Sequence, residues 1–334
     1  TEEVYCVRKD AIGIIDTGSN TVLGVIFRWD SKKNCYRCFS LDDGLTVHAG
    51  LIRYVQDGVM SAEGLQVLEN ALGQIRAFFA EHDVQPADVK CFATASLRGV
   101  TNFNAAAEVV ENIGYHLELL SGEEEAACDF EGMLQEMDWL EQDGASFPEQ
   151  GVALDMGGGS GQLLCFTSRK DKMLADFRSM PIGCLAVKKR LVSGDGSAPS
   201  DAELQEINGF IRSQIEQIPM IASLSETALE NAPAFFVMGG TVKAIVRLFE
   251  RLGWPVSDPS CPGSVTLQAE DLQKSLAYFR SADGIAMVQK YEAGRRETLV
   301  TGIQILLSIC QRVGASQMTV LQSGVREGYV LRHC

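Results

Sequence analysis

The chain has 334 residues, long enough for two domains, and 46% of them are hydrophobic while 22% are charged. This composition is that of a folded globular protein and excludes an intrinsically disordered chain. With 29 Lys and Arg against 44 Asp and Glu, the net charge is −15. Because general nucleic-acid binding needs massed cationic side chains, we expect no DNA partner. A small anionic ligand in a local cationic pocket remains compatible with this charge.

No apolar run approaches the roughly 20 residues that a membrane-spanning helix needs, so we expect no membrane partner. The N-terminal segment TEEVYCVRKD lacks the apolar core of a signal peptide, and we expect a cytoplasmic protein. Ten cysteines are scattered along the chain, and in that compartment they are expected to be reduced. Cys35 and Cys38 have metal or redox spacing, but no second pair and no following helix completes such a motif.

Apolar residues with strand or helix spacing follow one another through the first part of the chain. They predict, in order, strands at 11–16, 21–29 and 36–41, a helix at 61–81, a strand at 89–96, a helix at 103–113, a strand at 115–120 and a helix after 121. Ser61 is a good N-cap for the first of these helices. Strands that alternate with helices predict an α/β domain over residues 1–130.

Residues 131–150 are acidic and end with Gly, Ser and Pro, which indicates the end of a helix and then a loop that joins two domains. The pattern restarts after this loop, and residues 131–334 are expected to form the second domain. Its predicted elements are a strand pair from 151 onward, helices near 201–218 and 224–230, a strand within 232–240, and further helices to the end, the last of which packs back on the first domain.

Two segments of the sequence superpose without a gap. They are IGIIDTGSNTVLGVIF at 12–27 and GVALDMGGGSGQLLCF at 151–166. Asp16 coincides with Asp155 and Gly18 with Gly157. An internal repeat about one domain long predicts two related domains. We expect the two turns to face a shared cleft.

Each repeated segment places a turn of small residues directly after a strand. Glycine can present its backbone N–H to a ligand without a Cβ in the way, and successive N–H groups form an anion-binding nest. Since a strand follows each turn, the pattern indicates a phosphate-binding hairpin rather than a P-loop; turns that only join strands are the alternative. The candidate phosphate-binding residues are Gly18, Ser19, Asn20, Thr21, Gly157, Gly158, Gly159 and Ser160, with Gly240 and Thr241 of a third glycine-rich turn.

Acidic and basic side chains accompany these turns. Asp155 ends a strand where its carboxylate can hold Mg²⁺ beside phosphate oxygens. In SGEEEA, the first two glutamates suit the first turn of a helix, whereas Glu125 is one position further in and could accept a proton from water. Arg98, in ATASLR, could bind phosphate oxygens in a bidentate manner, and an exposed surface arginine is the alternative.

The chain carries an ordered series of motifs that resembles the exopolyphosphatase and guanosine pentaphosphate phosphatase (Ppx/GppA) family. The motifs are IDTGSNT, FATASLR, LLSGEEEA, LDMGGGSGQ, SMPIGCLAVKKR, VMGGTVKAI and SGVREGYV, and they cover nearly the whole chain. The resemblance implies the actin-like ATPase superfold, with two ribonuclease H-like α/β domains and an active-site cleft between them. It implies a hydrolase that uses Mg²⁺, or Mn²⁺, to release the terminal phosphate from polyphosphate or guanosine pentaphosphate, and it suggests a homodimer.

The resemblance also assigns roles to residues. Glu125 would be the general base for the attacking water, Arg98 would hold the terminal phosphate, and Asp155, with Asp16 facing it, would hold the metal. The family usually carries an acidic residue where this chain has Gln162, whose amide oxygen can ligate Mg²⁺ without negative charge.

Gln162 therefore leaves open a catalytically weakened protein that binds nucleotide or polyphosphate and regulates. A kinase of the same superfold is a further alternative, but the chain shows no sugar-binding set of residues.

Overall fold

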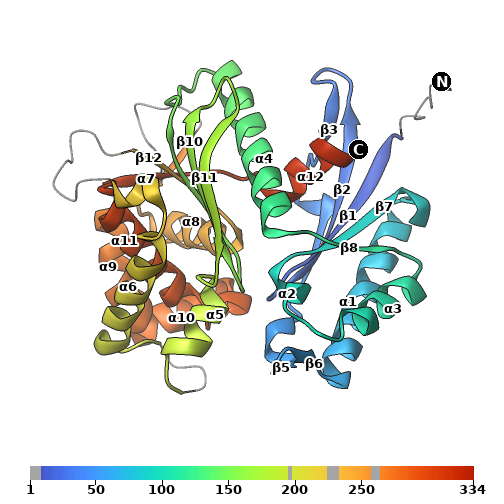
Figure 1. The fold of residues 1–334 in the computed structure, drawn as a ribbon, viewed down its shortest axis with the longest axis horizontal. Coiled ribbons are helices and arrows are strands. Elements are labelled where there is room, and N and C mark those ends of the chain that lie inside the picture. Colours follow the sequence, from blue (N-terminus) through green and yellow to red (C-terminus); the bar gives the residue numbers. More distant parts are fainter. Residues whose placement is uncertain (1–8, 195–197, 224–232, 257–263) are drawn as a thin grey trace. The chain divides into compact units, whose positions relative to one another are not determined.

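The computed structural model describes residues 9–194, 198–223, 233–256 and 264–334, which form two compact units (Figure 1). The first unit comprises the described residues up to Ser121 together with Val330–Cys334, and the second comprises those of Gly122–Tyr329. The predicted boundary after residue 130 falls inside helix α4 (Gly122–Gln142), which is continuous and belongs to the second unit. The loop that follows α4 therefore lies within the second unit.

The first unit is built on a mixed sheet in the order β3-β2-β1-β7-β8, with β4 also paired to β2. Its strands are β1 (Ala11–Thr17), β2 (Val22–Asp30), β3 (Cys35–Arg37), β4 (Gly44–Val47), β7 (Val89–Ala93) and β8 (Leu117–Leu119). Strands β1 and β2 form an antiparallel hairpin, while β7 and β8 extend the sheet in parallel. A separate two-stranded ribbon consists of β5 (Val55–Gln56) and β6 (Val59–Met60).

Two helices, α1 (Ala62–Glu81) and α3 (Phe103–Ile113), pack against this sheet. Their apolar side chains form one core cluster with inward-facing strand residues such as Ile15 and Ile26. The side chain of Ser61 accepts a hydrogen bond from Gly64 N at 3.1 Å, so the predicted N-cap of α1 is confirmed. The short helix α2 (Ala95–Arg98) directly follows β7.

The second unit contains a larger mixed sheet in the order β11-β10-β9-β12-β14-β13. Its strands are β9 (Gly151–Met156), β10 (Gly161–Ser168), β11 (Met173–Met180), β12 (Ala234–Met238), β13 (Val265–Gln268) and β14 (Gln317–Val320). Besides α4, its helices are α5 (Cys184–Leu191), α6 (Asp201–Ile215), α7 (Pro219–Ala222), α8 (Gly240–Leu252), α9 (Ala269–Arg280), α10 (Ala282–Tyr291), α11 (Leu299–Val313) and α12 (Val325–His333), which continues into the residues grouped with the first unit.

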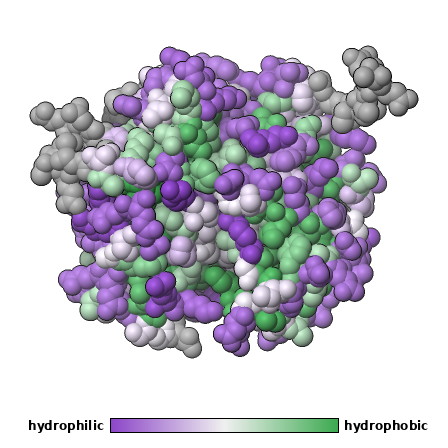
Figure 2. All heavy atoms as spheres, in the orientation of Figure 1, coloured by the Kyte–Doolittle hydropathy of each residue, from purple (hydrophilic) through white to green (hydrophobic). Residues whose placement is uncertain are grey.

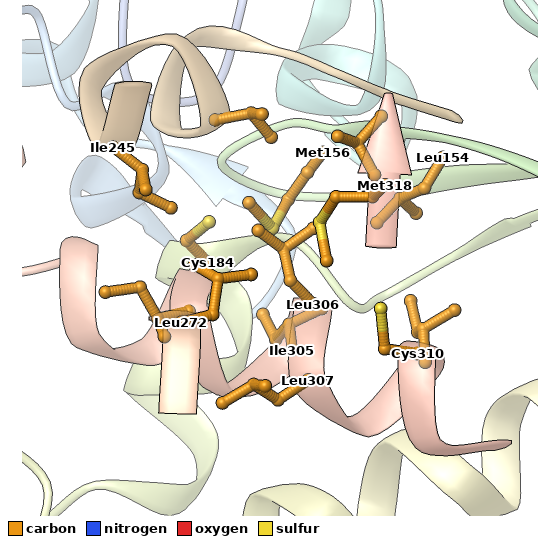
Figure 3. Packing of buried hydrophobic residues seen from close by; sticks show 14 of the residues in the cluster. Leu154, Met156, Cys184, Ile245, Leu272, Ile305, Leu306, Leu307, Cys310 and Met318 are labelled. Carbon is orange, nitrogen blue, oxygen red and sulfur yellow. The ribbon is translucent and has the colours of Figure 1, made fainter. Parts of the chain in front are cut away.

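Residues of β9 alternate between two cores on opposite faces of the second sheet. Leu154 and Met156 belong to the larger core, which the buried helix α11 shares, and Figure 3 shows them gathered with Leu306 and Met318. Ala153 belongs to a smaller core that α4 covers. Asp155 is two residues from Ala153 on the same strand, so its side chain lies on the α4 face of the sheet.

The strand pairing confirms the internal repeat. Asp16 pairs with Leu23 in the first hairpin, and Asp155 pairs with Gln162 at the equivalent register of the second. In both units a parallel strand, β7 or β12, then joins the first strand of the hairpin. The two units thus share the hairpin-plus-parallel-strand arrangement that the repeat predicts.

Several element predictions need correction. The segment predicted as a strand at 36–41 is a strand only to Arg37, and the one predicted at 89–96 ends at Ala93, where the chain turns into α2. Strands β11, β13 and β14 were not predicted, because β11 lies at a sheet edge with little burial and the other two have four residues each. The predicted helix at 224–230 lies outside the described residues.

In the described ranges, no helix combines the length and apolarity needed to cross a membrane. Figure 2 shows hydrophilic and hydrophobic residues intermixed on the face it draws. The cysteines of these ranges, Cys35 and Cys38 among them, form no disulfide with one another.

Helix α4 and the start of α12 approach so closely that only glycine fits between them. A Cβ on Gly328 would overlap the carbonyl oxygen of Cys128, and a Cβ on Gly132 would lie 2.5 Å from the carbonyl oxygen of Gly324. These obstacles are backbone atoms, which cannot move aside as a flexible side chain can. The contact fixes α4 against the loop that leads into α12.

We predict that Gly328→Ala lowers the stability of the second unit by about 1–3 kcal/mol or more, the range for overpacking a well-packed contact. The measurement is the midpoint of thermal and urea unfolding. Gly73→Ala is the matched control, because Gly73 lies in α1 with no atom near its missing Cβ and alanine is a better helix former. Equal midpoints for Gly328→Ala and the unchanged protein would contradict the close helix contact.

Candidate functional site

The same main-chain hydrogen bond closes both hairpin turns. Gly18 N donates to Thr21 O at 2.9 Å, and Gly157 N donates to Ser160 O at 3.0 Å. In each turn a Cβ on the glycine would lie 3.0 Å from the carbonyl oxygen of that partner. The structure therefore places the predicted phosphate-binding residues of both segments in equivalent, tightly closed turns.

The start of α5 holds the carbonyl groups of the second turn. Leu185 N donates to Gly158 O at 2.9 Å, and Cys184 N donates to Gly157 O at 3.1 Å. A Cβ on Gly183 would lie 2.6 Å from Gly158, so this approach requires glycine. The turn's carbonyl oxygens are thus engaged within the protein.

The first turn is held in the same manner. Gly50 N donates to Asn20 O at 2.8 Å, and Ile52 N donates to Ser19 O at 3.1 Å. These donors belong to the start of a short 3₁₀ helix, Leu51–Tyr54. A helix start binds the turn carbonyls in each unit, which supports a common function for the two turns.

Donors of the two turns remain unused in the described part of the chain. There, the N–H groups of Gly158 and Gly159 form no hydrogen bond. The side-chain nitrogen of Asn20 is buried and meets no acceptor among the described residues, although the residue is only 8% exposed. Because buried donors are nearly always satisfied in folded proteins, the buried Asn20 nitrogen favours an oxygen-rich ligand at the first turn. Gly158 and Gly159 are partly exposed, so their N–H groups are open to such a ligand or to water.

Gln162 lies beside Asp155 on the α4 face of the second sheet. The two residues are register partners in neighbouring strands, so their side chains share one face. Gln162 is 1% exposed, and its amide nitrogen donates to Ser160 Oγ at 2.9 Å and to Ser179 Oγ at 3.2 Å. With both amide hydrogens used, its carbonyl oxygen is the atom that can ligate a metal.

Charged groups from three elements surround Asp155. Burial raises the pKa of the Asp155 carboxyl, whereas the neighbouring Asp129 side chain and the positive charges of Arg326 and Lys243 act to lower it. The negative charge of Glu327, like burial, acts to raise the pKa of Asp155. An added cation beside Asp155 would favour the charged carboxylate and so lower its pKa.

Glu136 fixes the loop before α12 from the α4 side. Its carboxylate accepts hydrogen bonds from Gln322 N at 2.8 Å and from Ser323 N at 2.6 Å, and burial raises its pKa. Lys243 donates to the carbonyl of Gln322 from the other side, and burial lowers the Lys243 pKa. This anchoring sets the position of the SGVREG motif and of Arg326 within it.

The three glutamates at the start of α4 differ in exposure. Glu123 and Glu124 are exposed, while Glu125 is 5% exposed. On a helix, residues four apart lie on the same side, so Glu125 is a neighbour of Asp129. The predicted general base is therefore a buried carboxyl on the helix that covers the Asp155 face.

Arg98 belongs to the first unit, where α2 presents it. Thr17, at the end of β1, pairs with Ala93, at the end of β7, so the first turn and α2 leave adjacent strand ends. The hydroxyl of Ser96 donates to the carbonyl of Thr17 and ties α2 to β1. Arg98 is half-buried at the end of this short helix, beside the strand that leads into the Gly18 turn.

The third glycine-rich turn starts helix α8. A Cβ on Gly240 would overlap the guanidinium group of Arg295. Thr241 is buried, with its hydroxyl oxygen 3.5 Å from both Arg295 Nη1 and Cys184 Sγ. Arg295 thus lies across the two residues predicted to bind phosphate here.

The donor set of the second unit fits Mg²⁺. The carboxyl groups of Asp155 and Asp129 and the amide oxygen of Gln162 could supply oxygen ligands, and Mg²⁺ usually completes its shell with water and substrate phosphates. No group of three or more His, Cys, Asp or Glu ligands occurs in the described ranges, so such a site would rest on these few atoms. Asp16 lies in the first unit, on the sheet face opposite Ile15, and its place facing Asp155 stays a prediction.

Sequence reasoning missed Asp129, Glu136, Arg295 and Arg326 as members of these sites. Asp129 left a signal, because it is an acid at helical spacing among apolar residues such as Ala126 and Met133. The others were missed because their roles depend on long-range contacts that local spacing does not contain.

The sequence matches the Ppx/GppA phosphatase family over residues 44–334. A curated relative, the guanosine-5'-triphosphate,3'-diphosphate pyrophosphatase of Aeromonas hydrophila, is 24% identical over 266 residues, which are 79% of this chain and 48% of the relative. The chain thus spans about half the length of that relative.

Solved structures show the same fold. An exopolyphosphatase from Cytophaga hutchinsonii superposes with a TM-score of 0.75 at 18% identity, over 96% of both chains. A Ppx/GppA family member from Aquifex aeolicus superposes with a TM-score of 0.69 at 18% identity, again over 96% of both chains. These similarities establish the predicted actin-like α/β fold for both units. Since the family match extends over most of its length, the chain belongs to the Ppx/GppA phosphatase family.

Proposed function

We propose that this protein is a phosphoanhydride hydrolase that releases the terminal phosphate of inorganic polyphosphate or guanosine pentaphosphate with the help of Mg²⁺. The observation that carries the proposal is the turn after Asp155, in which the carbonyl groups are bound and the N–H groups of Gly158 and Gly159 form no hydrogen bond among the described residues. Family membership and the equivalent turn after Asp16 support it.

Binding of the substrate rests on donors that match phosphate oxygens. The N–H groups of the turns, the Asn20 amide and the Arg98 guanidinium would neutralise and orient the charged oxygens, which is most of what phosphoryl transfer requires. That the two units act on one substrate is a prediction from the repeat. Mg²⁺, when bound, would neutralise phosphate charge, and the residues proposed to hold it are Asp155, Asp16 and Gln162.

Glu125 is the proposed general base. It accepts a proton from a water molecule whose oxygen attacks the terminal phosphorus, and the bond from phosphorus to the bridging oxygen breaks with its electron pair on that oxygen. Its position at the start of α4, buried yet at a helix end, suits a base that meets one ordered water. General bases of this kind contribute about 10²–10⁴-fold to the rate.

Charge favours a short substrate. The net charge of −15 repels a long polyanion, and the short basic cluster at 187–190 includes Lys188, which is buried. We infer that short polyphosphates or guanosine penta- and tetraphosphates are preferred over very long chains.

The second candidate function is a weakened or inactive binding protein, and the burial of Gln162 in place of an acid favours it. Phosphate release from polyphosphate, guanosine pentaphosphate and ATP, measured with Mg²⁺ and with Mn²⁺, separates the candidates. Binding without release favours the regulatory protein, and ADP formation only in the presence of an acceptor favours a kinase.

We predict that Glu125→Gln lowers phosphate release by about 10²–10⁴-fold and leaves substrate binding intact, because the amide cannot take the proton. The measurements are phosphate release and substrate affinity under the same conditions. Glu124→Gln, at the exposed neighbouring position, is the control and should keep full activity. Full turnover by Glu125→Gln would rule out this base.

We predict that Asn20→Ala weakens the affinity for tripolyphosphate by about 10–100-fold, the loss expected for a hydrogen bond to a charged group. Its side-chain nitrogen has no acceptor among the described residues, so thermal stability should change little.

Asn102→Ala is the matched control for this experiment. Its amide bonds both Met60 N and Met60 O at 2.9 Å, so this substitution should lower thermal stability and spare tripolyphosphate affinity. The phosphate role of Asn20 is wrong if the two variants bind tripolyphosphate equally well.

A further inference from the structure

Asp129 is a fully buried carboxyl group in the interior of a helix. The residue is 0% exposed, and its neighbours on the same side of α4, Ala126 and Met133, belong to the apolar core beneath the second sheet. An acid placed among such residues is costly unless its charge is matched by a partner. Its presence there calls for a chemical reason.

The architecture brings Asp129 to the Asp155 face. The core beneath α4 contains Ala153, Leu164 and Phe166 of the sheet. Because side chains alternate along a strand, Asp155 and Gln162 lie on this same face of the sheet, nearer the turn. The Asp129 carboxyl is near enough to Asp155 to act on the pKa of that carboxyl.

Glycine contacts hold Asp129 in this place. Gly132, one turn further along α4, lies against the carbonyl of Gly324, and the position of a Cβ on Gly324 is 3.6 Å from Asp129 Oδ1. Cys128, the residue before Asp129, meets Gly328 of α12. Because backbone packs on backbone at these points, the backbone of α4 on either side of Asp129 is held in place.

Two adjacent carboxylates repel each other unless a cation or a proton lies between them. A divalent cation allows both to be charged, and carboxylate pairs with an amide oxygen are ligands that Mg²⁺ and Mn²⁺ accept. The register partner of Asp155 is an amide, Gln162, and the buried carboxylate of Asp129 lies on the helix that covers the same face.

We propose that Asp129 is the second carboxylate ligand of the divalent cation at Asp155 and supplies the negative charge that Gln162 does not. The inference rests on the proposed function for the presence of a cation, and it adds a carboxylate ligand on helix α4 to the residues proposed above. Because Glu125 lies one turn before Asp129, the same helix then carries the proposed base and a metal ligand.

The experiment is a titration of the metal-free protein with Mn²⁺, with the unbound ion followed by electron paramagnetic resonance and no substrate present. Asp129→Asn should weaken Mn²⁺ binding by about 10–100-fold, in line with the effect of removing a group that supports a metal site. Asp138→Asn, the same change at an exposed position of the same helix, is the control and should bind as the unchanged protein does.

The deciding measurement is the rescue in the double variant. Gln162→Glu restores a carboxylate on the same face, so Asp129→Asn with Gln162→Glu should recover most of the lost Mn²⁺ affinity. Weak Mn²⁺ binding in the single variant, followed by recovery in the double variant, supports Asp129 as the second carboxylate ligand. Equal binding by Asp129→Asn and the unchanged protein overturns it, as does an absence of recovery or an unchanged protein that binds no Mn²⁺ at millimolar concentration.

Thermal unfolding in the presence of a chelator keeps the test independent of folding. Asn fits the space of Asp and removes a buried charge, so Asp129→Asn should melt no lower than the unchanged protein when metal is absent, and it should gain less stability on adding Mg²⁺. Phosphate release is assayed separately. A protein that binds Mn²⁺ through Asp129 without hydrolysing either substrate would refute the proposed function alone.

Discussion

The hairpin turns at Gly18 and Gly157 each close with one main-chain hydrogen bond, and the proposed phosphate site depends on this constraint. When the N–H of the first glycine bonds the carbonyl three residues on, the residues between them cannot join the strand ladder. A helix start then takes up the carbonyl groups of those residues, in the first unit through Gly50 and Ile52 and in the second through Cys184 and Leu185. The N–H groups of these turns are left beside a carboxylate. N–H groups can bind phosphate oxygens, and the carboxylate can bind a cation that accompanies the phosphate.

Helix α4 carries both the proposed general base and the proposed carboxylate ligand of the second unit. It crosses the sheet on the Asp155 face, and the glycines at its contact with α12 permit the backbones to meet. A single rigid element therefore determines where Glu125 and Asp129 lie, while Glu136, further along it, anchors the loop that carries Arg326. Side chains fixed by one helix keep their relative geometry, which catalytic groups need.

Local patterns predicted much of this. The repeat of Asp, Gly and small polar residues gave the register of both hairpins, and Ser61 gave the start of α1, because these depend on neighbours in sequence. The distinction of Glu125 from Glu124 followed from helical spacing. The positions of Asp129, Arg295 and the α12 start could not be derived in this way, since each depends on contacts between segments far apart in the chain. The short strands β13 and β14 were missed because four residues carry too little periodicity.

The most direct test is a crystal structure of the Glu125→Gln variant with tripolyphosphate and Mg²⁺. We predict that one bound tripolyphosphate places its oxygens within hydrogen-bonding distance of the N–H groups of Gly158 and Gly159 and of the side-chain nitrogen of Asn20. A tripolyphosphate bound away from both turns, or one that touches a single turn and leaves the other to solvent, would contradict it.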